Sequence, residues 1–204
     1  MNSKSTFLQL KETERAHRRD LILDAAMTLF AERPFHEIGM RDIADEAGIS
    51  PASIYRYFSS RDDILAEILD QEVLEGSQRQ QDRIRKGTAS FEQIAAGIVD
   101  FFLEKEATFQ MLSHFLLKDE VDEEARKKFE AIQEHYLEQF DSVLAQVGCA
   151  RENVRLFSRA YFASMLGIVM SFRKVPGHSQ GEIRKQVHRL ARLSATVFKN
   201  GMPT

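Results

Sequence analysis

The chain is poor in the residues that cross-link or interrupt a backbone. Its 204 residues include one cysteine and four prolines, and no proline lies between Pro51 and Pro176. A single cysteine allows no internal disulfide, which excludes a small secreted fold held together by such bonds. A β-rich chain rarely runs this far with so few turn signals. We therefore expect a helical fold in a reducing compartment.

Long apolar runs and a strong excess of one charge are also missing. The longest apolar run, residues 160–169, is interrupted by Ser164 and Gly167 and is too short to span a bilayer. The N-terminus lacks the charged-then-apolar layout of a secretion signal. The net charge is −3 at pH 7, with 28 Lys and Arg against 31 Asp and Glu. These properties predict a cytoplasmic protein that neither enters a membrane nor coats nucleic acid by bulk attraction.

Motifs for catalysis and for metal binding are lacking as well. The chain has no Gly-rich phosphate loop, no nucleophile elbow and no His-Glu-x-x-His pair. His114 and His135 fall on different predicted helices, without a cysteine or acidic partner at ligand spacing. We therefore expect no enzyme activity, no metal site and no cofactor.

What the chain does contain is a segment, residues 39–58, that has the pattern of two short helices joined by a tight turn. Gly48 is expected to end the first helix, because glycine takes a left-handed backbone without steric cost. Ser50 can cap the second helix, and Pro51 suits its first position. The order of these signals is that of a helix-turn-helix, whose second helix enters the DNA major groove.

The second helix of this segment would bury Ile54 and Phe58, one turn apart, and leave its other side chains for a partner. Arginine reads guanine edges, serine bonds several bases, and tyrosine and arginine hold phosphates. A plain helical hairpin explains the turn but not this exposed side, which carries no acidic residue. The DNA-binding candidates are Arg41, Ser50, Pro51, Ala52, Ser53, Tyr55, Arg56, Tyr57 and Arg61.

The segment around this motif is not basic in total. Residues 1–57 carry eight Lys and Arg against nine Asp and Glu. Phosphate attraction depends on the cations that reach the DNA backbone, so a local stripe of arginines can suffice. The members of that stripe are Arg15, Arg18, Arg19, Arg41, Arg56 and Arg61.

Residues 39–65 resemble the DNA-binding domain of the TetR family of bacterial transcriptional regulators. The residues that agree with the family pattern are Ile43, Ala44, Ala47, Gly48, Ser50, Tyr55, Tyr57, Phe58, Ser60 and Leu65. Four positions depart from it, namely Gly39, Ala52, Ser53 and Arg61, where the family usually has threonine, glycine, threonine and lysine. Because Gly39 has no hydroxyl, the helix cap and phosphate contact of that threonine do not carry over.

The resemblance implies an all-α fold with two parts. A three-helix helix-turn-helix domain at residues 16–60 would follow a flexible arm at residues 1–15. A larger helical domain for ligand binding and dimerisation would occupy residues 61–204. A helix from Ser60 to Glu75 would join the two.

Dimerisation is expected at the last two helices, where the family forms a four-helix bundle. Residues 161–172 offer apolar or small side chains in every direction, so this helix must be covered on two sides. The alternative is a fully buried central helix in a monomer. The interface candidates are Ala160, Ala163, Ser164, Gly167, Ser171, Val187, Leu190 and Ser194.

The resemblance also implies an internal cavity for a small-molecule effector. Polar groups set among aromatic residues suit such a cavity, although core packing explains each single residue as well. The candidates are Phe102, His114, Gln133, Tyr136, Phe140, Tyr161 and Met165. We therefore expect a homodimeric repressor that a hydrophobic or aromatic effector releases from a palindromic double-stranded DNA operator. The alternative is an activating, chromosome-organising or partner-recruiting DNA-binding dimer without an effector.

Overall fold

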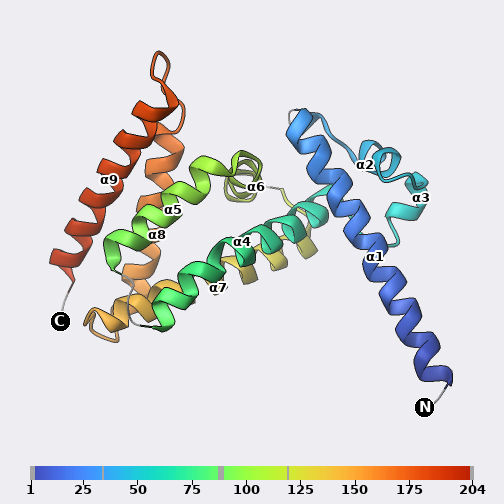
Figure 1. Ribbon diagram of the computed structural model, residues 1–204, viewed down its shortest axis with the longest axis horizontal. Coiled ribbons are helices and arrows are strands. Elements are labelled where there is room, and N and C mark those ends of the chain that lie inside the picture. Colours follow the sequence, from blue (N-terminus) through green and yellow to red (C-terminus); the bar gives the residue numbers. More distant parts are fainter. Residues whose placement is uncertain (1–2, 34, 87–89, 119, 203–204) are drawn as a thin grey trace. The chain divides into compact units, whose positions relative to one another are not determined.

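The computed structural model of the chain describes residues 3–33, 35–86, 90–118 and 120–202. All regular structure within these residues is helical, which confirms the all-α class (Figure 1). The chain divides into two compact units. Unit 1 comprises residues 1–71 and 110–129, and unit 2 comprises residues 72–109 and 130–204. This division does not coincide with the expected boundary at residue 60, because residues 110–129 pack with the N-terminal segment.

Unit 1 contains the helix-turn-helix segment and parts of three longer helices. Its elements are α1 (Ser3–Glu32), the 3-10 helix η1 (Phe35–Glu37), α2 (Met40–Glu46), α3 (Pro51–Ile54), the start of α4 (Arg61–Arg85), and parts of α6 (Glu106–Leu117) and α7 (Glu123–Gln146). Apolar side chains from these helices form one core, among them Ile22, Ala26, Ile43, Ile54, Leu65, Leu112 and Phe129.

Helix α1 is longer than expected from the sequence. It begins at Ser3, so residues 3–15, which were expected to form an arm before the first helix, belong to α1, whereas residues 1–2 lie outside the described part. This stretch contains neither proline nor glycine. The Arg18 guanidinium also lies 2.7 Å from the Glu14 carboxylate, and such pairs four residues apart favour a helix.

Helix α4 also extends past its expected end. Its first turn is capped as expected, since the Ser60 hydroxyl accepts a hydrogen bond from the Asp63 amide at 3.1 Å. The helix does not stop at Glu75 but continues to Arg85. Gly76 has the lowest helix propensity in this extension, and one interior glycine costs only about 1 kcal/mol.

Unit 2 is a helical bundle whose elements are the rest of α4, α6 and α7 with α5 (Phe91–Glu104), α8 (Val154–Phe172) and α9 (Gln180–Gly201). Helix α5 packs against α8 and α9, which pack against each other (Figure 1). Helix α5 starts with a reciprocal cap, because Ser90 and Gln93 each bond the other's backbone amide. Within the described residues, no helix is long and apolar enough to cross a membrane.

Candidate DNA-binding interface

The turn between α2 and α3 is built as its residue types predict. Gly48 has φ +66°, the left-handed conformation that ends α2. The Ile49 amide then donates to the Ala44 carbonyl at 3.0 Å, which closes the turn. At the start of α3, the Ser53 amide donates to the Ser50 hydroxyl at 3.1 Å. These bonds hold α3 in one orientation relative to α2.

The second helix is anchored on one side and exposed on the other. Ile54 and Phe58 are buried in the core of unit 1. Tyr55 keeps 58% of its surface exposed, and Arg56 is exposed as well. Regular α-helix ends at Ile54, and residues 55–57 continue as hydrogen-bonded turns rather than as the longer helix expected. The remaining candidates in this segment, Ser50, Pro51, Ala52, Ser53 and Tyr57, are exposed or half-buried.

The arginines expected to form one DNA-facing stripe have different roles. Arg41 is exposed on α2. Arg19 instead donates to the Tyr57 carbonyl and to the Glu67 carboxylate, each at 2.6 Å, and lies over the Phe58 ring. Arg61 is half-buried and donates to the Ile38 carbonyl at 3.1 Å. Arg19 thus supports the recognition segment, and Arg61 joins the start of α4 to the residues before α2.

The start of α2 is capped although it lacks the usual threonine. The Gly39 amide donates to the Asp42 carboxylate at 2.8 Å. This backbone hydrogen bond, assisted by Arg33, lowers the pKa of Asp42. Sequence reasoning noted the loss of threonine at Gly39 but missed this replacement, whose signal is an acid three residues into a helix.

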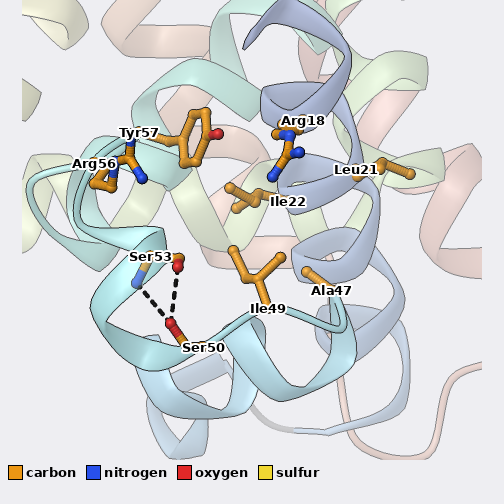
Figure 2. Close-up of a pocket in the computed structure, with 9 residues that line it drawn as sticks. All are labelled: Arg18, Leu21, Ile22, Ala47, Ile49, Ser50, Ser53, Arg56 and Tyr57. Carbon is orange, nitrogen blue, oxygen red and sulfur yellow. Dashed lines mark hydrogen bonds between the residues drawn. The ribbon is translucent and has the colours of Figure 1, made fainter. Parts of the chain in front are cut away.

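A cleft of about 190 Å³ opens between α1 and the recognition segment. Figure 2 shows Arg18 of α1 facing Arg56 and Tyr57, with the hydrogen-bonded Ser50 and Ser53 hydroxyls at the other end. The rest of the lining is apolar and comes from Leu21, Ile22, Ala47 and Ile49. Cationic and hydroxyl groups on an apolar floor suit an anionic ligand with carbon edges.

The segment that builds this turn and cleft also matches a known family model. Residues 22–68 match the model described as bacterial regulatory proteins of the tetR family. The match runs from α1 into the start of α4 and includes the whole helix-turn-helix. Residues 22–68 therefore form a TetR-family domain.

Known proteins resemble this TetR-family chain to different extents. The fatty acid metabolism regulator protein of Bacillus subtilis (strain 168) is 27% identical over 127 residues, which cover 61% of this chain and 65% of that protein. The HTH-type transcriptional repressor KstR2 of Rhodococcus jostii (strain RHA1) is 50% identical over 52 residues, or 26% of each chain. The chain therefore matches less than two thirds of the length of these relatives.

Solved structures share the fold over most of their length. A transcriptional regulator from Rhodococcus sp. RHA1 aligns with a TM-score of 0.70 at 13% identity, covering 91% of this chain and 98% of that one. The fatty acid degradation regulator FadR from Bacillus halodurans aligns with a TM-score of 0.63 at 20% identity, covering 86% and 94% of the two chains. At these identities, the likeness shows the fold alone.

The effector candidate His114 belongs to an ion-pair network in unit 1. Its Nε2 lies 2.9 Å from the Asp62 carboxylate, and the Lys118 ammonium lies 3.1 Å from the other oxygen of that carboxylate. Burial by itself would raise the pKa of Asp62, but the hydrogen bonds from His114 and Lys118 outweigh it and lower this pKa to about 2. His114 thus joins α6 to α4 within unit 1 of the TetR-family chain.

Two further carboxylates of α4 extend this network. The Lys128 ammonium of α7 lies 2.6 Å from Asp63 and 2.8 Å from Glu67. Burial opposes ionisation of both acids, but hydrogen bonds from Lys128, from Arg19 to Glu67 and from Ser59 to Asp63 keep both pKa values lowered. The network therefore links α1, α4, α6 and α7 of unit 1. Sequence reasoning did not find these pairs, because their partners lie on helices far apart in the sequence.

Other effector candidates gather in the aromatic core of unit 2. The Phe140 ring lies 6.2 Å from Tyr136 and 5.8 Å from Tyr161. Burial raises the pKa of Tyr136 to about 12. The Tyr161 hydroxyl donates to the Phe91 carbonyl at 3.1 Å. Of the remaining candidates in this TetR-family unit, Met165 and Phe102 are buried and Gln133 is half-buried.

The dimer candidates divide into two groups. Ala160, Ala163, Gly167 and Ser171 are exposed along one side of α8. The other four are half-buried or buried. The hydroxyls of Ser164 and Ser194 lie 2.7 Å apart between α8 and α9, Val187 is fully buried and Leu190 is half-buried. Helical spacing marks an apolar stripe but not which helix covers it, so Val187 is corrected to a core residue.

The described residues contain no group of three His, Cys, Asp or Glu side chains that could hold a metal ion.

Proposed function

We propose that this TetR-family chain is a transcriptional regulator that reads a specific operator through residues 50–58. The observation that carries the proposal is the two-sided recognition segment, anchored by Ile54 and Phe58 and exposing Tyr55 and Arg56. A short rigid helix that presents such side chains is suited to the major groove. Arg56 can bond the two acceptors of a guanine, while the hydroxyls of Ser53 and Tyr55 reach bases or phosphates.

The working form in this proposal is a homodimer that pairs through α8 and α9. Helix α8 exposes Leu156 and Met170 on the side that carries its exposed small residues, and α9 exposes Leu193 and Val197. Small residues allow close approach of a second helix, and the larger side chains supply apolar area to bury. A two-fold dimer presents two recognition segments to two inverted half-sites, so the expected operator is an inverted repeat.

The ligand in this proposal is a hydrophobic molecule with a long acyl chain, held in unit 2, which releases the dimer from DNA. Support comes from the aromatic core around Phe140 and from the name of the Bacillus subtilis relative. The match to that fatty acid metabolism regulator spans 127 residues, more than the helix-turn-helix domain contains. If ligand and operator favour different separations of the two recognition segments, each weakens the binding of the other by the same free energy.

An activating role is the second candidate. The HTH-type transcriptional activator FasR of Mycolicibacterium smegmatis is 32% identical over 88 residues, which cover 43% of this chain and 40% of that protein. The same recognition segment serves both roles. In-vitro transcription from the identified operator distinguishes them, because a repressor lowers the transcript level on binding and an activator raises it.

The first test is selection of bound duplexes from a random DNA pool at near-physiological salt, followed by sequencing. The proposal expects enrichment of an inverted repeat. Tyr55→Ala and Arg56→Ala should each weaken binding to that duplex by about 1 to 3 kcal/mol. Arg151→Ala, which changes an exposed arginine in the turn before α8, is the matched control and should leave binding unchanged. A folded wild-type protein that enriches no motif would refute sequence-specific binding.

The effector is tested on the selected duplex. The protein–DNA complex is titrated with palmitoyl-CoA, with palmitate and with acetyl-CoA, while fluorescence anisotropy reports release of the DNA. Acetyl-CoA carries the same charge as palmitoyl-CoA but has a short acyl chain. The proposal expects release by the long-chain compounds and none by acetyl-CoA. Equal release by all three, or by none, would contradict an acyl-chain site.

A further inference from the structure

One face of α1 combines the wall of the cleft with a row of cations. Arg18 and Ile22 line the cleft. Lys11 and Arg15 lie seven and three residues before Arg18, so they continue the same helix face. The side chains of Lys11, Arg15 and Arg18 are all exposed. All three precede residues 22–68, the segment that matches the family model.

The cations also lie on a rigid support. Helix α1 is continuous from Ser3 to Glu32, and Figure 1 shows its N-terminal half extending beyond α2 and α3. A helix advances 1.5 Å per residue, so Lys11 and Arg18 are separated by about 10 Å along the axis. One strand of DNA carries a phosphate every ~3.4 Å along the duplex axis, so two charges this far apart can reach separate phosphates of one strand. The helix holds both charges at a constant separation.

The cleft has the chemistry of a site for a sugar-phosphate unit. Arg18 and Arg56 supply guanidinium groups that bind phosphate oxygens in a two-pronged geometry. The Ser50 and Ser53 hydroxyls lie 2.8 Å apart, and one proton of the pair remains for an outside acceptor. The apolar floor, which includes Ile49, can contact the carbon edges of a deoxyribose.

The contacts that Arg18 and Arg19 already make decide which of these two arginines of α1 is available to bind an anion. Arg19 already donates to Tyr57 and Glu67 inside unit 1. Arg18 donates to Glu14, but this pair is solvent-exposed, with 52% and 62% of the two side chains accessible. Exposed pairs of this kind are weak, and a guanidinium has five donors. Arg18 can therefore bind an anion in the cleft without breaking the structure.

We propose that α1 is a second DNA-contacting element of this chain. Arg18 binds a backbone phosphate seated in the cleft opposite Arg56, and Arg15 and Lys11 bind phosphates further along the same strand. The proposal rests on the proposed operator binding. It predicts that α1 contributes affinity but no sequence preference, because phosphate contacts carry no base information.

The test compares Arg18→Gln with Arg151→Gln, which removes the same charge from an exposed arginine in the turn before α8. Operator affinity is measured by anisotropy from 0.05 to 0.3 M salt. Each phosphate contact adds about 0.9 to the slope of log affinity against log salt concentration, or about eightfold in affinity at 0.1 M salt. Arg18→Gln should lose this increment, and Arg151→Gln should keep it. The variant lacking Lys11, Arg15 and Arg18 should lose about three increments.

A second measurement locates the contact. Single phosphates of the operator are replaced by uncharged methylphosphonates, one position at a time. Replacement at one position should weaken operator binding by the wild-type protein but not by Arg18→Gln. The motif selected from the random pool should be the same for both proteins. Equal slopes and equal position profiles for Arg18→Gln and Arg151→Gln would overturn the proposal. That result is distinct from failure of the proposed function, in which the wild-type protein selects no operator.

Discussion

Replacing the buried carboxylate of Asp62 is the most exacting test of the ion-pair network in unit 1. Asp62 is 7% exposed and is held by His114 of α6 and by Lys118, which follows the end of α6. Lowering its pKa from 3.8 to about 2 favours the folded chain. Because a tenfold change in proton affinity equals about 1.4 kcal/mol, the stabilisation amounts to about 2 kcal/mol at neutral pH. Asp62→Asn should lower the free energy of unfolding by this amount.

The sign of the pH dependence follows from the direction of the pKa change. The folded-state pKa of Asp62 is below its unfolded value, so the stabilisation is present above about pH 4 and is lost as the pH falls through about 2. About half of it remains near pH 3. The deficit of Asp62→Asn relative to the wild-type chain should therefore shrink to about 1 kcal/mol at that pH.

Urea unfolding followed by circular dichroism, at one protein concentration and at pH 7 and pH 3, measures both deficits. Asp20→Asn, which changes an exposed aspartate of α1, is the control and should match the wild-type chain at both pH values. An equal deficit for Asp62→Asn at pH 7 and pH 3 would mean that lost packing, not charge, causes the effect. No deficit at pH 7 would refute the ion pairs themselves.

Three further changes have expected outcomes. Gly48→Ala forces a side chain into a left-handed backbone and should destabilise unit 1 by about 1 to 2 kcal/mol in urea unfolding, whereas an unchanged stability would contradict the positive φ. Tyr161→Phe leaves the Phe91 carbonyl without its buried donor and should lower the free energy of unfolding by about 1 to 3 kcal/mol. An unchanged free energy of unfolding would show that this hydrogen bond is not made. Ala163→Arg places a charge on the exposed stripe of α8 and should convert the proposed dimer to monomers in sedimentation. A dimer that persists in this variant would exclude this face of α8 as the dimer interface.

Absorbance titration tests the environment of Tyr136. Because burial raises its pKa to about 12, this phenol should not ionise in the folded chain below about pH 11. Comparison of the wild-type chain with Tyr136→Phe isolates its signal. A difference between the two that develops near pH 10 would show that the ring is solvated.

Local chemistry made the helix-turn-helix predictable. Gly48 and Ser50 act through their own backbone preferences and through partners only a few residues away, so their roles can be read without tertiary structure. The caps at Ser60 and Ser90 are local in the same way. The start of α4 therefore agrees with the sequence prediction. Its end does not, because Gly76 was not a strong enough local signal to stop the helix, which continues to Arg85.

The sequence by itself determined the helical class, the turn at Gly48 and the anchored and exposed sides of the recognition segment, because each depends on residues within a few positions of one another. Only the tertiary structure decided that His114 binds Asp62, 52 residues away, and that Arg19 braces Tyr57 and Glu67 while Arg18 lines the cleft. Residue type and helical spacing are the same for a side chain that faces solvent, a core or a charge. The choice among these surroundings is made by packing between distant segments, and that packing has no signature in a single stretch of sequence.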